Sequence, residues 1–252
     1  MVDSNLKKVA RNFSTIYPIM KDAGLRRIKG LKVASILSDA IGDKPVNTLL
    51  DIGCSNALLL DVVTEQLAPE FAVGIDMDSA ALPKPTNLRA CVTGDAMHLP
   101  FASGSIDMVI CNHTYEHVPD AHLLFAEIKR VIKPGGIVYF SAMNAAWPME
   151  PHYHLPLIHW MPQRLAQVIL KPRGFPDGYH EKPLGLSGLK KLVADFEIRD
   201  YTLKVIDDPD KYHANDLIKN RLLYFLFRWL ARPLYRLLPG YLWVLVKRAD
   251  QP

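Results

Sequence analysis

The residues Asp51-Ile52-Gly53-Cys54-Ser55-Asn56-Ala57 have the types and the spacing of a turn that cradles a nucleotide. They follow a short apolar run at 46–50 that favours a β-strand, and they precede residues 58–63, which favour a helix. An acid followed by small residues at alternate positions, between a strand and a helix, lets the backbone approach a bound ligand closely. Gly53 also permits backbone angles that side chains exclude.

A second acid, Asp76, supports this interpretation. It follows the apolar run Phe71-Ala72-Val73-Gly74-Ile75 and lies 25 positions after Asp51. This separation matches one strand, one helix and a second strand, with the second acid at the place of a bound ribose. An ionised carboxylate there can accept hydrogen bonds from both ribose hydroxyls. The two acids together predict a ligand that contains a nucleoside.

The chain resembles the class I S-adenosylmethionine (SAM)-dependent methyltransferases of the type 11 domain family. The resemblance rests on segments between residues 46 and 142 that follow the family's order and spacing. They are Leu50–Cys54, Gly74–Asp76, Gly94–Ala96 with Leu99–Phe101, Ile106–Ile110, Glu116–Val118 and Lys133–Gly136. Ser55 and Ala57 occupy places where fuller versions of the motif carry glycine, and both residues are nearly as small.

The resemblance implies a role in SAM binding for the residues of the first two loops. Asp51, Gly53 and Cys54 would line the methionine end of the cofactor, and Asp76 would bind the ribose. The alternatives are an aspartate that caps a turn and an aspartate that ends a strand.

The same resemblance implies contacts to the adenine. Asp95 would bond the adenine amino group, Ala96 would lie against the ring, and Met77 would pack on its face. Asn112 would contact the cofactor or the substrate. The alternatives are an ordinary loop aspartate and a methionine of the core.

Histidines follow the expected strand 106–111, and ligands of such sheets bind at the carboxyl ends of strands. We predict that His113 acts at the methyl acceptor, because a histidine can take the proton of a hydroxyl near neutral pH. The alternative is a loop histidine held by hydrogen bonds. His117 belongs to the Glu-His-Val segment, for which we expect a structural role.

Residues 143–183 contain seven prolines, which predicts a structured insertion rather than a long helix. We predict a lid that recognises the acceptor, with His152, Tyr153 and His154 as substrate-binding residues. The alternatives are pure packing and a metal site that includes His159; our prediction is that no metal is bound. The insertion also resembles, more loosely, those of methyltransferases of bacterial surface-polysaccharide biosynthesis.

Strands and helices alternate along the core, which predicts a doubly wound α/β fold with a mostly parallel, seven-stranded, Rossmann-like sheet. The expected helices are 5–16, 24–41, 57–67, 120–132 and 186–195. The expected strands are 46–52, 71–76, 88–92, 106–111, 136–142, 196–206 and 241–246. We predict a single domain 1–252. Its parts are a helical cap (1–42), the cofactor-binding core (46–142), the insertion (143–183), and C-terminal strands (184–252) with a basic helical insertion (208–239).

Basic residues gather near the C-terminus. Residues 211–248 carry a charge of +7, so the rest of the chain carries −3 of the total of +4. This distribution argues against an extended nucleic-acid-binding surface. It favours contact between the basic segment alone and an anionic partner. Arg221, Arg228 and Arg232 share one helical face beside many apolar residues. We therefore weigh a peripheral membrane contact through 212–238 against a helix packed on its own domain.

Three cysteines, Cys54, Cys91 and Cys111, fall in or beside expected strands, so we predict reduced, buried thiols. Residues 1–11 are polar, unlike a signal peptide. We expect a cytoplasmic protein, with the inner face of the membrane as a place of association.

The predicted function is SAM-dependent methyl transfer to a small or lipid-linked acceptor at oxygen, including a sugar or surface-polysaccharide precursor. One alternative is an inactive SAM-fold scaffold or peripheral membrane module. Another is an NAD-dependent oxidoreductase, for which the sequence lacks a full Gly-x-Gly-x-x-Gly turn and a Tyr-Lys hydride site.

Overall fold

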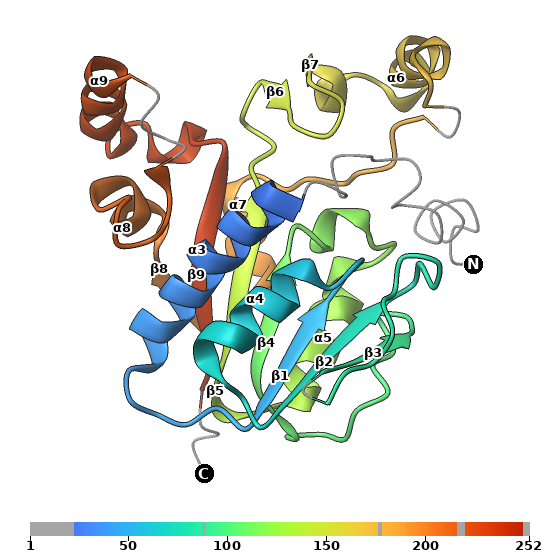
Figure 1. The fold of residues 1–252 in the computed structure, drawn as a ribbon. Coiled ribbons are helices and arrows are strands. Elements are labelled where there is room, and N and C mark those ends of the chain that lie inside the picture. Colours follow the sequence, from blue (N-terminus) through green and yellow to red (C-terminus); the bar gives the residue numbers. More distant parts are fainter. Residues whose placement is uncertain (1–22, 88, 176–177, 216–219, 249–252) are drawn as a thin grey trace.

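A seven-stranded sheet forms the centre of the computed structural model, which describes residues 23–87, 89–175, 178–215 and 220–248 (Figure 1). The strand order is β3-β2-β1-β4-β5-β9-β8. The strands are β1 (Thr48–Ile52), β2 (Phe71–Asp76), β3 (Arg89–Thr93), β4 (Ile106–Asn112), β5 (Ile132–Met143), β8 (Phe196–Asp200) and β9 (Gly240–Lys247). Neighbouring strands from β3 to β5 are parallel, and β9 runs antiparallel to β5 and β8. The predicted doubly wound, mostly parallel fold is therefore confirmed.

Helices cover both faces of the sheet. On one face, α3 (Ala23–Ile41), α4 (Leu58–Leu67) and α8 (Thr202–Asp207) pack on one apolar cluster. On the other, α5 (Ala121–Val131) and α7 (Leu186–Leu192) pack on a second cluster. Gly30 lets α3 approach α4 closely, because a Cβ there would lie 2.7 Å from Val62 Cβ. The helix expected at 5–16 lies outside the described residues.

The strand predicted at 196–206 is wrong in its second half. β8 ends at Asp200, and α8 begins at Thr202. The buried residues of this half are Thr202, Val205 and Ile206, spaced by three and one positions. That spacing places them on one face of a helix, so the apolar period changes from that of a strand to that of a helix within the segment.

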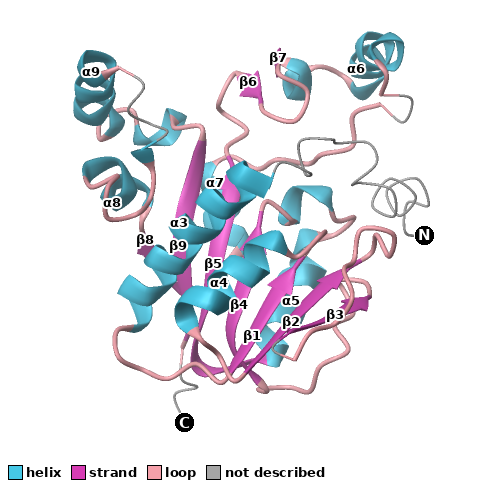
Figure 2. Cartoon of the chain, viewed as in Figure 1, coloured by secondary structure: helices cyan, strands magenta, loops and turns pink. Residues whose placement is uncertain are grey.

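The insertion between β5 and α7 is built from short elements (Figure 2). They are β6 (Met149–Glu150), β7 (Leu155–Pro156), η3 (Ile158–Trp160), α6 (Gln163–Leu170) and η4 (Lys171–Arg173). The insertion has an apolar cluster of its own, formed by Tyr153, Ile158, Ala166, Leu170 and Tyr179. It lies at the end of the molecule where the parallel strands end (Figure 1).

A second helical segment separates β8 from β9, as the sequence predicts. After α8 it contains α9 (Arg221–Ala231) and η6 (Tyr235–Leu237). α9 lies beside α8, at the same end of the molecule as the insertion (Figure 1). Within the described residues, every helix is too short or too polar to cross a bilayer.

Candidate active site

The turn after β1 keeps the backbone path of a glycine-rich loop although it contains one glycine. Gly53, Ser55 and Ala57 all have positive φ angles, of 77°, 50° and 55°. A Cβ at Gly53 would lie 2.9 Å from Thr114 Oγ1, so the position also has no room for a side chain. Ser55 and Ala57 thus adopt the left-handed conformation that glycine takes most easily. The two positions that carry glycine in fuller versions of the motif therefore keep positive φ angles in this chain.

Asp76 ends β2 and closes this turn from the neighbouring strand. Its Oδ2 accepts a hydrogen bond from the Ser55 backbone N–H at 2.7 Å, and its Oδ1 accepts one from Asp78 at 2.8 Å. Burial raises the pKa of Asp76, and these backbone bonds oppose the rise. Each carboxylate oxygen has a further lone pair, so both can still accept bonds from a pair of ligand hydroxyls.

Asp51 is the penultimate residue of β1 and is buried. Burial raises its pKa to about 7, while the positive charge of Arg26 lowers it. Cys54, at the start of the turn, is buried against Gly74, and burial raises the pKa of its thiol, which keeps it uncharged. The end of β1 and the turn after it therefore present one titratable acid beside a neutral thiol.

Arg26 of α3 is the functional candidate that the sequence reasoning missed. Its side chain is buried, burial lowers its pKa, and the charges of Asp51 and Asp76 oppose that decrease. It lies one turn before Gly30 on the buried face of α3. A charged residue on an apolar helical stripe was the available signal, because it must face a partner or a ligand inside the fold.

The loop that follows β3 lies beside the carboxyl end of β2, where Asp76 is found. The Gly94 N–H donates to the Asp76 carbonyl at 3.0 Å, and Asp95 Oδ1 accepts from the Met97 N–H at 2.9 Å. Met77, Asp95 and Ala96 are half-buried at this junction. The structure thus brings the predicted adenine contacts together, whereas their contact with a ligand stays a prediction.

His113 follows Asn112, the last residue of β4, and has a φ angle of 53°. Its Nδ1 lies 3.2 Å from Glu116 Oε1, and its Nε2 lies 3.0 Å from Ser141 Oγ. Burial raises the pKa of Glu116, but His113, His117 and His152 reverse this and hold it below its usual value. Donation from Nδ1 to Glu116 would leave Nε2 as an acceptor, the arrangement that a general base requires.

The three substrate-binding residues predicted in the insertion do not share one environment. Tyr153 is buried in the insertion, where its hydroxyl lies 3.1 Å from both carboxylate oxygens of Glu181. His154 is exposed, with a φ angle of 53°. His152 is half-buried and turns back toward His117, with the ring centroids 4.9 Å apart. Their contact with an acceptor stays a prediction.

The groups at this end of the sheet fit the cofactor that the resemblance implies. SAM has an amino-acid end with one carboxylate and one ammonium group, a ribose diol and an adenine. The described residues offer a buried cation (Arg26), a buried acid (Asp51), and a second acid (Asp76) with open acceptor capacity. These groups lie on α3 and at the carboxyl ends of β1 and β2.

Comparisons with known proteins agree with this geometry. A family model described as a methyltransferase domain matches residues 50–140. A demethylmenaquinone methyltransferase of Roseiflexus castenholzii is 31% identical over 190 residues, which cover 72% of this chain and 76% of that protein. A ubiquinone biosynthesis O-methyltransferase of Pectobacterium atrosepticum is 33% identical over 136 residues, or 50% of this chain and 55% of that protein.

Solved structures show the same fold. The plantazolicin methyltransferase BpumL superposes with a TM-score of 0.58 at 15% identity, and the match covers 98% of this chain and 91% of that one. The MccD protein matches with a TM-score of 0.55 over 86% of this chain and 96% of its own, also at 15% identity.

Proposed function

The chain belongs to the class I SAM-dependent methyltransferases, and we propose that it methylates an oxygen of a lipid-linked acceptor at a membrane surface. Membership rests on the 31% identical demethylmenaquinone methyltransferase, of which the chain covers 76%, and on the matching family model. The names of this relative and of the ubiquinone O-methyltransferase both mention quinones, which are molecules with lipid-soluble chains. These names support a lipid-linked acceptor, and the second supports transfer to oxygen.

Within this proposal the loop residues divide the cofactor between them. Arg26 would pair with its carboxylate, Asp51 with its ammonium group, and Asp76 with its ribose diol. When bound, SAM supplies a methyl group on a positively charged sulfur, which keeps the bonding electrons when the methyl leaves. His113 Nε2 would exchange the Ser141 hydroxyl for that of the acceptor and take its proton.

The exposed apolar face of α9 supports the proposed contact with a membrane surface. Leu222, Phe225 and Trp229 are 68%, 67% and 70% exposed. Together with Leu226 they recur at a helical spacing of three and four residues, so they form one face. A helix with such a face, and a basic surrounding sequence, suits the interface of an anionic bilayer.

Two of the three arginines predicted to share a helical face lie at the C-terminal end of α9 and directly after it. Arg228 and Arg232 share a face, but both pair with Asp207 of α8, at 3.0 and 2.6 Å. They therefore hold α9 on α8 and turn its apolar residues outward. A helix packed on its own domain, the alternative to a membrane contact, describes one side of α9: Ala231 is buried and Phe227 packs beside it against α8, whereas Leu222, Phe225 and Trp229 face outward.

Vesicle binding tests the membrane contact. The double variant Phe225→Ser/Trp229→Ser should bind anionic vesicles at least about tenfold more weakly than the wild type. Burial of one such side chain contributes about 1.5–3 kcal/mol, and 1.4 kcal/mol is a factor of ten. Phe71→Ser, which removes an exposed aromatic residue at the start of β2, should bind as the wild type does. Equal binding of wild type and double variant would refute the contact.

Product partition tests the acceptor. The full chain is incubated with SAM labelled in its methyl group and with a lipid extract or a water-soluble extract of its source cells. We expect the labelled methyl group in the organic phase, attached to a product from which alkaline hydrolysis does not release it. Label confined to the aqueous phase would favour a sugar or surface-polysaccharide precursor instead. SAM binding without transfer from either extract would favour an inactive scaffold. A location on the cytoplasmic side of the membrane stays a prediction.

A further inference from the structure

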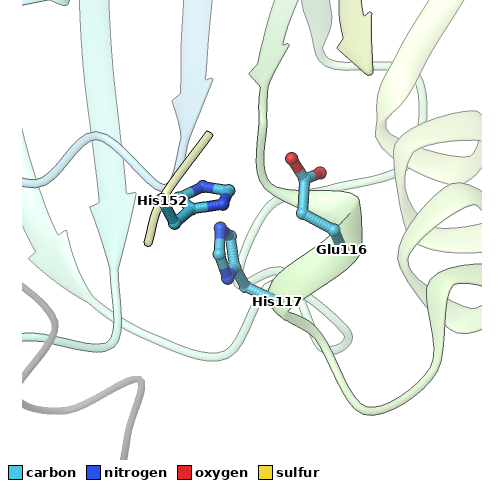
Figure 3. A group of neighbouring side chains, drawn as sticks. All are labelled: Glu116, His117 and His152. Carbon is cyan, nitrogen blue, oxygen red and sulfur yellow. The ribbon is translucent and has the colours of Figure 1, made fainter. Parts of the chain in front are cut away.

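Glu116, His117 and His152 form a cluster that the cofactor loops do not use (Figure 3). One ligand atom of each residue, a carboxylate oxygen or an imidazole nitrogen, lies within 4.8 Å of the other two. Glu116 and His117 belong to the short 3-10 helix η2 (Tyr115–His117), which follows β4 in the chain. His152 belongs to the turn between β6 and β7. The cluster therefore joins the core to the insertion.

Glu116 gives an independent sign of a missing ligand. Its side chain is fully buried. Its Oε1 contacts His113 Nδ1 at 3.2 Å, whereas its Oε2 is buried without a hydrogen-bond partner among the described residues. A buried carboxylate oxygen without a partner is costly, because it loses its water and gains nothing in return. A cation beside Oε2 would remove that cost.

His152 is oriented as metal-binding histidines are. Its Nδ1 lies 2.7 Å from Glu150 Oε1, and Glu150 is fully buried. Glu150 Oε2 in turn accepts from the Tyr153 N–H at 2.7 Å, which fixes the carboxylate. A carboxylate bonded to one nitrogen sets the ring orientation and makes the other nitrogen a better ligand. A metal ion would bind through Nε2.

We propose that Glu116, His117 and His152 bind one divalent transition-metal ion, of which Zn²⁺ fits the donors best. Two imidazole nitrogens and one carboxylate oxygen are a ligand set of zinc sites that keep a fourth position for water or substrate. Bonds of about 2.0–2.1 Å in a tetrahedral site place the ligand atoms about 3.3 Å apart. Binding would therefore draw the three atoms together by at most about 1.5 Å from their present 4.8 Å limit.

The proposed site differs from the sequence prediction that no metal is bound, which stays untested. The histidines weighed there were His152, His154 and His159. The fold separates them, since His154 is exposed and His159 contacts the Ala145 carbonyl at 3.2 Å. It brings His152 instead to His117, 35 positions earlier in the chain. The alternative is a network of hydrogen bonds that ties the insertion to the core without metal, and zinc titration separates the two.

Zinc titration of the chelator-treated full chain is the first test. Calorimetry should show one site per chain with a dissociation constant below about 1 μM. His152→Ala should weaken binding by about 100-fold or more, and Glu150→Gln by about 10–100-fold, because it loosens the ring of His152. His154→Ala is the matched control, two residues away in the same turn and exposed, and should bind as the wild type does. Circular dichroism confirms that each variant is folded.

X-ray absorption of the zinc-loaded wild type is the second test, and it needs no variant. We expect imidazole nitrogens and a carboxylate oxygen at about 2.0–2.1 Å. Sulfur around the zinc, from Cys54, Cys91 or Cys111, would overturn the proposal. So would the absence of binding tighter than millimolar, or wild-type affinity in His152→Ala. Neither readout involves methyl transfer. Absence of zinc binding would therefore not count against the proposed methyltransferase function, and absence of methyl transfer would not count against the zinc site.

Discussion

Asp51 offers a test of the buried charge pair at the cofactor loops. In the folded protein its pKa is about 7, against 3.8 for a free side chain, mainly because the carboxyl is buried and in spite of Arg26. A carboxyl with a raised folded-state pKa favours folding while it is protonated. Its contribution is fully present below pH 3.8 and is lost as the pH rises through 7. The ligand-free protein should therefore lose stability over this range.

The size of the effect follows from the difference between the two pKa values. About three units at 1.36 kcal/mol each correspond to a loss on the order of 4 kcal/mol by pH 8. Asp51→Asn removes the titration and keeps the shape of the side chain. Since Asp76 still faces Arg26 in that variant, Arg26 retains an acidic neighbour. We expect Asp51→Asn to be more stable than the wild type at pH 8 by about 2–4 kcal/mol, and nearly equal to it at pH 4.

Urea denaturation of the ligand-free wild type and variant at pH 4, 6 and 8 measures this difference. Asp43→Asn, at an exposed position between α3 and β1, also removes one negative charge and should change the free energy of unfolding by less than about 0.5 kcal/mol. The reasoning is refuted if Asp51→Asn is less stable than the wild type at pH 8, or if the difference between them does not grow with pH.

Three further predictions concern the neighbouring residues. Asp76→Ala should weaken SAM binding by about 1.5–3 kcal/mol, through loss of charge-assisted hydrogen bonds; unchanged affinity in calorimetry, with the fold intact, would remove Asp76 from the site. His113→Ala should lower turnover by about 10²-fold and leave SAM affinity nearly intact; full turnover in a rate assay would leave His113 a structural role. Gly53→Ala should destabilise the protein by about 1–3 kcal/mol in urea, because φ is 77° and its Cβ would meet Thr114. Wild-type stability of that variant would show that the loop adapts.

Much of the sheet could be predicted because local patterns determine it. The apolar runs that became β1, β2 and β4 are short, buried and followed by polar or small residues. The acids that end or follow these strands gather at one edge because parallel strands end there. The gathering of Asp51, Asp76 and Asn112 at one edge of the sheet could therefore be predicted from order and spacing. Their role in SAM binding comes from the family resemblance and stays a prediction.

The remaining features depend on contacts between distant segments. The acids near Arg26 could not be identified from the sequence. Asp51 and Asp76 lie 25 or more positions later in the chain, and only the packing of α3 on the sheet brings them close to Arg26. Which face of α9 packs on the domain could not be predicted either. Asp207, the residue that pairs with Arg228, lies 21 positions earlier in the chain. Periodicity gives the faces of a helix but not which face packs on the domain. The approach of His152 to Glu116 likewise depends on how the insertion folds back.

Calorimetric titration of the purified full chain with SAM, and separately with NAD, tests whether the chain binds the methyl donor at the predicted residues. We predict binding of one SAM per chain, no heat with NAD, and loss of most of the SAM affinity in Asp76→Ala. Binding of NAD in place of SAM, or no SAM binding by a folded wild-type protein, would contradict this prediction.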